Sequence, residues 1–289
     1  LDERPCNYLY PDYIGKISGS DVVLVPRKLM GNFKQPADIE GIWEWIKNET
    51  TDADVLIVSM DLFLYGGIVP SRLHHFSEEV CAGRIERLKL LKEENPNLKI
   101  YAFQLITRAP ARDGSGEEPD YYENYGYRIF RYGVLRDKEK LQLISEEERA
   151  EKARIEKEVP KEVLEDFLNR RAVNFNNNKH SIDLLAEGVL DFLIIPLDDC
   201  REHGYAPAER RMLASHARSR NLFSKVYFYP GADETGCTLL ARAINEVGQK
   251  PPSVYVDYSS IRGKYQVPSY EDRSIGETVQ YQLLAAGCG

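Results

Sequence analysis

Apolar, strand-like runs alternate with helical patterns along most of this chain. The runs are rich in Val, Ile, Tyr and Phe, and stretches with helical apolar spacing fill the gaps between them. The runs show little alternation of apolar and polar residues, as expected for strands that are covered on both faces. Repeated strand–helix units are typical of a parallel sheet wrapped in helices. The sequence therefore predicts an α/β fold.

The pattern also predicts where the elements lie. Strands are expected over residues 21–26, 54–60, 99–108, 190–199, 225–234 and 252–260, and helices over residues 36–47, 78–94, 206–220, 234–247 and 274–286. The opening LDERPCN resembles the tail of a βα unit, and the closing AAGCG resembles a helix end that leads into another strand. With one strand implied at each end, the set favours a (βα)8-barrel-like sheet, possibly incomplete, and the alternative is an open doubly wound sheet.

The alternation of strand-like and helical segments is interrupted between about residues 112 and 188. A loop, RDGSGEEPDYY, is followed by the tyrosine-rich YYENYGYRIFRYG and by highly charged helical sequence. We expect a single α/β domain over residues 1–289 with a helical insertion over this interval. One interpretation is a solvated helical hairpin. The other is a lid whose tyrosines face a ligand, because the insertion follows the carboxyl end of a predicted strand.

Composition excludes several classes of protein. The 46 acidic residues outnumber the 38 basic ones, which argues against a nucleic-acid partner, since such proteins neutralise phosphates with clustered positive charge. No apolar run reaches the roughly 18 residues that span a bilayer, so no membrane association is expected. The 5 scattered cysteines form no CxxC pair, which favours a reducing, cytoplasmic location over a disulfide framework.

Polar residues gather directly after the apolar runs, where each predicted strand ends. The carboxyl ends of parallel strands lie on one face, so these side chains should converge on one pocket. For any single acid, such as Asp233, capping of the following helix is the competing interpretation. The expected pocket residues are Asp2, Glu3, Arg4, Asp61, Tyr65, Arg72, Arg108, Asp198, Asp199, Asp233 and Glu234.

Two adjacent carboxylates, Asp198 and Asp199, end the run LDFLIIPL. Regular strand neighbours point to opposite faces, but at a strand end both can reach one ligand. Such a pair can divide acid and stabilising roles, as the two carboxyls of glycosidases do. We therefore expect Asp199 to act as general acid and Asp198 to orient the substrate or stabilise developing positive charge. Arginines near the pocket, Arg201 among them, would offset the crowded carboxylates.

Two other chemistries compete with this one. Asp198, Asp199 and His203, with Asp61 or Glu234, could bind a divalent metal, although no HxH or HExxH spacing occurs and His203 is more readily a loop residue. Cys200 is disfavoured as a nucleophile because the preceding acids raise a thiol pKa. The chain contains no GxSxG elbow, P-loop or GxGxxG motif.

Five motifs spread over nearly the whole chain outside the helical insertion resemble one family. They are LDERPCN, VSMDLFLYGGIVPSR, PLDDCREHGYAPAERR, YPGADETGCTLLARAIN and VPSYEDRSIGETVQYQLLAAG. Their combination is similar to bacterial proteins grouped as the family of unknown function DUF4127. Members of that family continue beyond the AAG segment, so the resemblance implies a truncated member. It implies no particular reaction.

These patterns lead to a functional hypothesis. We expect a glycoside-hydrolase-like enzyme without a cofactor that acts on a small-molecule or carbohydrate substrate, with Tyr65 and the inserted tyrosines as stacking surface. One alternative is a metal-dependent hydrolase that uses a divalent metal. The other is a non-catalytic protein that binds a carbohydrate or metabolite.

Overall fold

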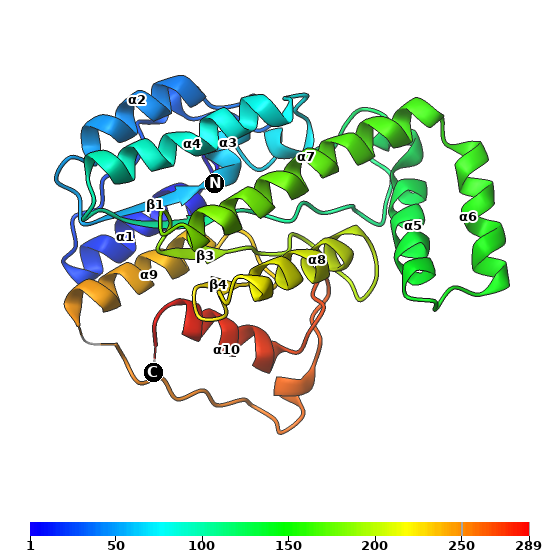
Figure 1. Ribbon diagram of the computed structural model, residues 1–289. Helices are drawn as coiled ribbons and strands as arrows, with labels where there is room; N and C mark the ends of the chain where they lie inside the picture. Colours follow the sequence, from blue (N-terminus) through cyan, green and yellow to red (C-terminus); the bar gives the residue numbers. More distant parts are fainter. Residues whose placement is uncertain (250, 289) are drawn as a thin grey trace.

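A parallel sheet lies at the centre of the computed structural model, which describes residues 1–249 and 251–288 (Figure 1). Its strands are β1 (Val55–Ser59), β2 (Lys99–Phe103), β3 (Phe192–Ile194) and β4 (Val226–Tyr227). They lie in the order β1-β2-β3-β4, and every neighbouring pair is parallel. The predicted α/β fold with a parallel sheet is therefore confirmed.

One face of the sheet is covered by the helices that connect its strands: α4 (Glu78–Glu94), α7 (Lys161–Ala186) and α8 (Tyr205–Ser219). Parallel strands are joined by right-handed crossovers, so strands that follow chain order have their connecting helices on the same face. Ile100, Ala102 and Leu193 point to this face and share a core with Leu88 of α4 and Leu185 of α7.

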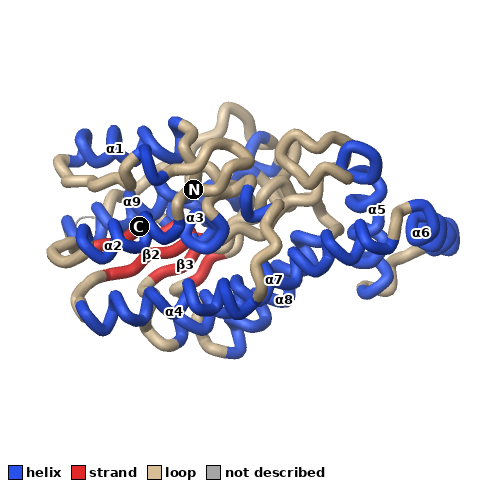
Figure 2. The backbone as a smooth tube through the Cα atoms, turned by 90° about the horizontal axis from the view of Figure 1, so that it is seen from above, coloured by secondary structure: helices blue, strands red, loops and turns tan. Residues whose placement is uncertain are grey.

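The opposite face is covered by α9 (Thr235–Gly248) and α10 (Ile275–Ala285), and α1 (Pro5–Ser18) packs against α9. Figure 2 shows α1 and α9 on one side of the sheet and α4 on the other. Tyr101, Phe103 and Phe192 face α9 and share a second core with Leu239. Successive residues of β2 thus supply both cores, as the pleat of a doubly covered strand requires.

The remaining helices lie at the ends of the sheet. Near β1 are α2 (Ile39–Glu49) and α3 (Met60–Tyr65), and short 3₁₀ turns occupy Arg27–Leu29, Pro70–Arg72 and Gly263–Tyr265. Helices α5 (Tyr122–Lys140) and α6 (Glu146–Glu158) project away from the sheet together with the first half of α7 (Figure 1). Their own apolar cluster includes Tyr122, Ile129 and Phe167. The second half of α7 packs on the sheet through Ile182 and Leu185. The single-domain organisation of the whole chain stays a prediction.

The expected (βα)8-barrel-like closure is not seen in residues 1–249 and 251–288. The sheet is open, with β1 and β4 at its edges, and the part of the alternative that specified an open sheet is right. Its strand order never reverses, whereas a doubly wound sheet has a reversal. The order is the sequential one that barrels also use, but the sheet does not close.

Two predicted strands are wrong. Residues 21–26 and 252–260 form no strand, and within them the side chains of Val23 and Tyr255 are 57% and 91% exposed. A strand needs a hydrogen-bonded neighbour, and these apolar segments have none, so local composition misled the prediction. The predicted helices are confirmed with shifts of a few residues at their ends. In the described part of the chain no helix is long and apolar enough to cross a membrane.

Candidate active site

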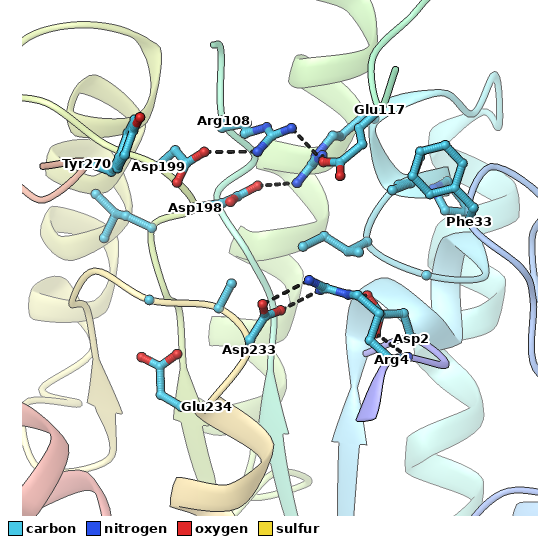
Figure 3. A pocket seen from close by; sticks show the side chains of 18 of the residues that line it. Asp2, Arg4, Phe33, Arg108, Glu117, Asp198, Asp199, Asp233, Glu234 and Tyr270 are labelled. Carbon is cyan, nitrogen blue, oxygen red and sulfur yellow. Dashed lines mark hydrogen bonds and ion pairs between the residues drawn. The ribbon is translucent and has the colours of Figure 1, made fainter. Parts of the chain in front are cut away.

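A polar cavity of about 410 Å³ opens where the strands end at their carboxyl termini (Figure 3). Ligand pockets commonly have volumes of about 300–1,000 Å³. Of the residues predicted from the sequence, its walls include Asp2, Glu3, Arg4, Arg72, Arg108, Asp198, Asp199, Asp233 and Glu234. The structure therefore brings most of the predicted residues together around one cavity, while their chemical roles stay a prediction.

Parallel strand pairing continues beyond the regular sheet and fixes which residues reach the cavity. Ile106 pairs with Leu197, and Leu197 pairs with Pro230, both in parallel. The residues just after these positions, among them Arg108 and Asp198, therefore reach the same edge of the sheet. This matched register explains why segments so far apart in the sequence share one cavity.

Arg72 joins three carboxylates at the wall of the cavity. Its Nη2 donates to Asp198 Oδ2 at 2.7 Å, and its Nη1 donates to Glu117 Oε2 at 2.9 Å. The same Nη1 lies 3.4 Å from Glu118 Oε1. The Arg72 side chain is only 4% exposed. These contacts fix the 3₁₀ turn Pro70–Arg72 against the end of the sheet.

Arg108 runs beside Arg72 and shares its glutamates. Its Nη1 donates to Asp199 Oδ2 at 2.9 Å, and its Nη2 donates to Glu117 Oε2 at 2.6 Å. Its Nε donates to Glu118 Oε1 at 2.9 Å. Each arginine thus holds one member of the Asp198–Asp199 pair. Figure 3 shows the contact between Arg108 and Asp199. Each of the two aspartates therefore lies against a guanidinium group.

Both adjacent aspartates line the cavity, as expected for a strand end. Asp199 has a φ of +37°, which takes it out of the extended conformation. Its side chain is 40% exposed, whereas that of Asp198 is 9% exposed. The backbone turn at Asp199 therefore lets one aspartate lie deep and the other near solvent.

Glu117 and Glu118 have opposite pKa shifts although they share the same two arginines. Burial raises the pKa of Glu118, whose side chain is 5% exposed, and the arginine charges offset this only in part. Burial also acts to raise the pKa of Glu117, but the hydrogen bond from Arg72 and the charge of Arg108 outweigh it and lower the pKa. Glu117 is 41% exposed, so its desolvation is weaker.

The prediction missed Glu117, which lines the cavity, and Glu118, which lies behind it. Both lie in the loop RDGSGEEPDYY, away from any strand end, so the strand-end argument did not apply to them. One signal in the sequence could have identified them, namely that they are two adjacent acidic residues shortly after Arg108. The prediction also missed Phe33, Tyr270 and Glu271, which line the cavity from loops.

A second ion-paired group closes the cavity beside α1. The Arg4 guanidinium donates from Nε to Asp2 Oδ2 at 2.7 Å and from Nη1 to Asp233 Oδ2 at 2.9 Å. Asn7 Nδ2 also donates to Asp2 Oδ1 at 2.9 Å. Asp233 therefore links the segment after β4 to α1. The side chain of Glu3 lies nearby and accepts from the Phe33 backbone N–H at 2.9 Å.

Glu234 lines the cavity at the start of α9 and has a different environment. Its Oε1 accepts from Gln282 Nε2 of α10 at 2.9 Å. Burial raises the pKa of Glu234. A Cβ atom on Gly231 would lie 1.9 Å from Glu234 Oε1, so the carboxyl group rests directly against that glycine. Within the described chain, none of the ion pairs of the cavity includes Glu234.

Two residues predicted for the pocket lie in the core instead. Asp61 is 1% exposed, and its Oδ2 accepts from the Leu105 backbone N–H at 2.9 Å. Burial raises the pKa of Asp61 to about 7. Tyr65 is 1% exposed, stacks on His74 and accepts from Asn177, so it offers no stacking surface to a ligand. Because α3 begins immediately after β1, the chain turns these side chains inward.

The metal set proposed as an alternative does not assemble. His203 lines a separate cavity with Asp199, whereas Asp198 lines only the main one. The nearest carboxylate to His203 Nδ1 is Asp137 Oδ2 at 3.7 Å. Over residues 1–249 and 251–288, no group of three or more His, Cys, Asp and Glu side chains is arranged to hold a metal ion.

Comparison with known proteins places the chain in one family. No curated protein and no solved structure matches it. The family described as "Protein of unknown function (DUF4127)" matches over residues 1–289, and this extent gives no support to the expectation of a truncated member. This match over the whole sequence shows that the chain belongs to the DUF4127 family.

Proposed function

We propose that this DUF4127 protein is a glycoside-hydrolase-like enzyme whose carbohydrate substrate binds in the carboxylate-lined cavity. The environment of Glu234 is the observation that carries the proposal. Its carboxyl group lines the cavity, its pKa is raised by burial, and it is held by the neutral amide of Gln282. A buried carboxyl without a cationic partner is suited to take up and deliver a proton, because burial disfavours its charged form.

The other charged groups of the cavity suit a polyhydroxylated ligand. Carboxylates accept hydrogen bonds and guanidinium groups donate them, while each sugar hydroxyl does both. Asp233 with Arg4 and Asp199 with Arg108 place such complementary groups side by side in the cavity wall. Because the ion pairs fix these side chains, little conformational entropy would be lost when a sugar binds.

Glycoside hydrolysis also needs a carboxylate that stays ionised while positive charge develops on the sugar. Asp198 and Asp199 are our candidates for that role, since each forms an ion pair with an arginine of the cavity. In these pairs the carboxylates accept hydrogen bonds from guanidinium groups, whereas Glu234 accepts from the neutral amide of Gln282. We therefore assign the general acid to Glu234 instead of Asp199 and keep Asp198 and Asp199 as stabilising carboxylates.

A non-catalytic carbohydrate-binding protein is the second candidate. Most carboxylates of the cavity are held in ion pairs, an arrangement that also suits a rigid hydrogen-bonding surface. That candidate predicts a ligand that raises the melting temperature and is not turned over.

Aryl glycosides that differ only in the leaving group test the assignment. A dinitrophenolate leaves without protonation, whereas a phenolate needs the general acid. On a panel that includes N-acetylhexosaminides, Glu234→Gln should lose about 10²–10⁴-fold in kcat/KM on phenyl glycosides and far less on dinitrophenyl glycosides. Asp199→Asn should impair both to a similar extent, because stabilisation of positive charge is needed with either leaving group.

Two results would overturn the proposal. In one, the wild-type protein hydrolyses no glycoside of the panel, and binding without turnover would then favour the second candidate. In the other, Glu234→Gln matches wild type with both leaving groups.

A further inference from the structure

A smaller cavity of about 200 Å³ adjoins the main one. The two share Arg108, Asp199 and Tyr270 in their walls. The two cavities are therefore neighbours on either side of Asp199, and one extended ligand can contact both. The second cavity takes no part in the function proposed above.

The two cavities differ in charge. Arg108, Arg112, Arg201 and His203 line the second cavity. Asp199 is the one carboxylate among the described residues that line it. Acidic side chains outnumber arginines in the wall of the main cavity, whereas the opposite holds here. The protein as a whole has a net charge of −8, so a cavity in which arginines outnumber acids is a local exception to its acidic character.

Two of these cations are available to a ligand. Arg108 is occupied by Asp199, Glu117 and Glu118, but in residues 1–249 and 251–288 neither Arg112 nor Arg201 takes part in an ion pair. The Arg201 guanidinium carbon lies 5.6 Å from the centre of the Phe130 ring, which holds the group beside the cavity.

Nearby acids outside the cavity do not cancel this charge. Asp137 lies 3.7 Å from His203 Nδ1, but it is buried and already accepts from the Gly204 N–H and pairs with Arg211. Glu202 is 91% exposed and does not line the cavity. The free positive charge of Arg112 and Arg201 therefore remains for a ligand.

We infer that the second cavity binds an oxyanion group of the substrate, a carboxylate, sulfate or phosphate ester on the unit next to the one in the main cavity. Guanidinium groups bind such planar or tetrahedral oxyanions through paired N–H donors. The substrate would thus be an acidic saccharide. Only the saccharide part of this inference rests on the function proposed above, because the arginine site binds its anion whether or not a glycosidic bond is cleaved.

Matched disaccharides test the inference by calorimetry at low ionic strength. The probes are a neutral disaccharide and its forms that carry one uronic acid, one 6-sulfate or one 6-phosphate on either unit. Wild type should bind at least one acidic form more tightly than the neutral one, and added salt should reduce the difference. The form preferred distinguishes a carboxylate from a sulfate or phosphate.

Variants then assign the preference to the second cavity. Arg112→Gln/Arg201→Gln should weaken acidic binding about tenfold and leave neutral binding unchanged. Both side chains are exposed, so folding should be retained. Arg218→Gln makes the same type of substitution at an exposed arginine on α8 outside both cavities and should change neither affinity.

The outcomes separate the two proposals. Equal binding of neutral and acidic forms by wild type, or a preference that survives in the double variant, overturns the oxyanion site even if glycosides are hydrolysed. An arginine-dependent preference without any hydrolysis supports the oxyanion site and counts against the proposed enzyme.

Discussion

Arg72 and Asp198 lie 126 residues apart in the sequence and form a buried ion pair, with Nη2 and Oδ2 2.7 Å apart. The pair connects the turn after α3 to the end of β3. Glu118 reaches the same guanidinium from the loop before α5. The candidate active site and the packing of three chain segments therefore depend on one buried cation.

Replacing Arg72 by a neutral residue should lower the free energy of unfolding. Arg72→Met leaves the buried carboxylates of Asp198 and Glu118 without one of their positive partners, and breaking a buried pair in this way costs about 3–5 kcal/mol. Arg128→Met is the control, because Arg128 and Glu158 are each 42% exposed and such pairs contribute about 0–1 kcal/mol. Urea denaturation measures both. Equal losses in the two variants would contradict the structural role of Arg72.

Asp61 should make stability depend on pH in the direction opposite to that of most aspartates. Its folded pKa is raised to about 7 by burial, against about 3.9 in an unfolded chain. Between about pH 4 and 7 the folded protein holds a proton that the unfolded chain has lost, so unfolding free energy falls as pH rises through this window. The loss attributable to Asp61 is up to about 4 kcal/mol and is complete above its folded pKa.

Asp61→Asn isolates this effect, because the asparagine side chain is neutral throughout and can still accept from the Leu105 N–H. The unfolding free energy of the variant relative to wild type should increase from pH 5 to pH 8. Asp52→Asn, at an exposed position, should show no comparable trend. A pH-independent difference for Asp61→Asn would show that Asp61 is ionised in the folded protein across this range.

Local sequence signals located helices α2, α4, α8, α9 and α10 and the strands of the sheet, but they did not indicate α1 or α3. Helix α4 spans the predicted residues 78–94 because Ser77 caps its first turn and the apolar spacing runs through to Leu91. The apolar runs that form β1, β2 and β3 also pair with one another as parallel strands. Residues 21–26 and 252–260 have similar composition, but strand pairing depends on a distant neighbour that no local pattern reveals. The same dependence explains why closure into a barrel could not be judged from the runs.

The site was predictable where it follows the strand ends. Asp198, Asp199 and Asp233 were found because matched parallel register brings such positions together. Asp61 was misplaced because a helix begins one residue earlier and turns the side chain into the core. Glu117 was missed because its position depends on how a long loop folds back over two arginines, which only tertiary structure shows.

The amide of Gln282 should tune the pKa of Glu234. A hydrogen bond donated to the carboxylate favours its ionised form, so Gln282→Leu should raise the pKa of Glu234 further. The alkaline limb of the kcat/KM profile, where the proton donor is lost, should then move to higher pH. Gln280→Leu on the same helix, at an exposed position, is the control. NMR titration of the Glu234 carboxyl group gives a readout independent of turnover, and an unchanged pKa in Gln282→Leu would contradict this coupling.

Gly231 and Gly114 share a φ of +128° and differ in what an added methyl group would meet. An alanine at either position would have to adopt this positive φ, which costs a non-glycine residue about 1–3 kcal/mol. Both variants should therefore lose similar stability. Only in Gly231→Ala would the new Cβ collide with the Glu234 carboxyl group, since nothing lies within 4 Å of a Cβ on Gly114. Under conditions where both variants are folded, Gly231→Ala should therefore lose most of its glycoside hydrolysis while Gly114→Ala keeps it. Equal turnover in the two variants would mean that the position of Glu234 against Gly231 has no part in the chemistry.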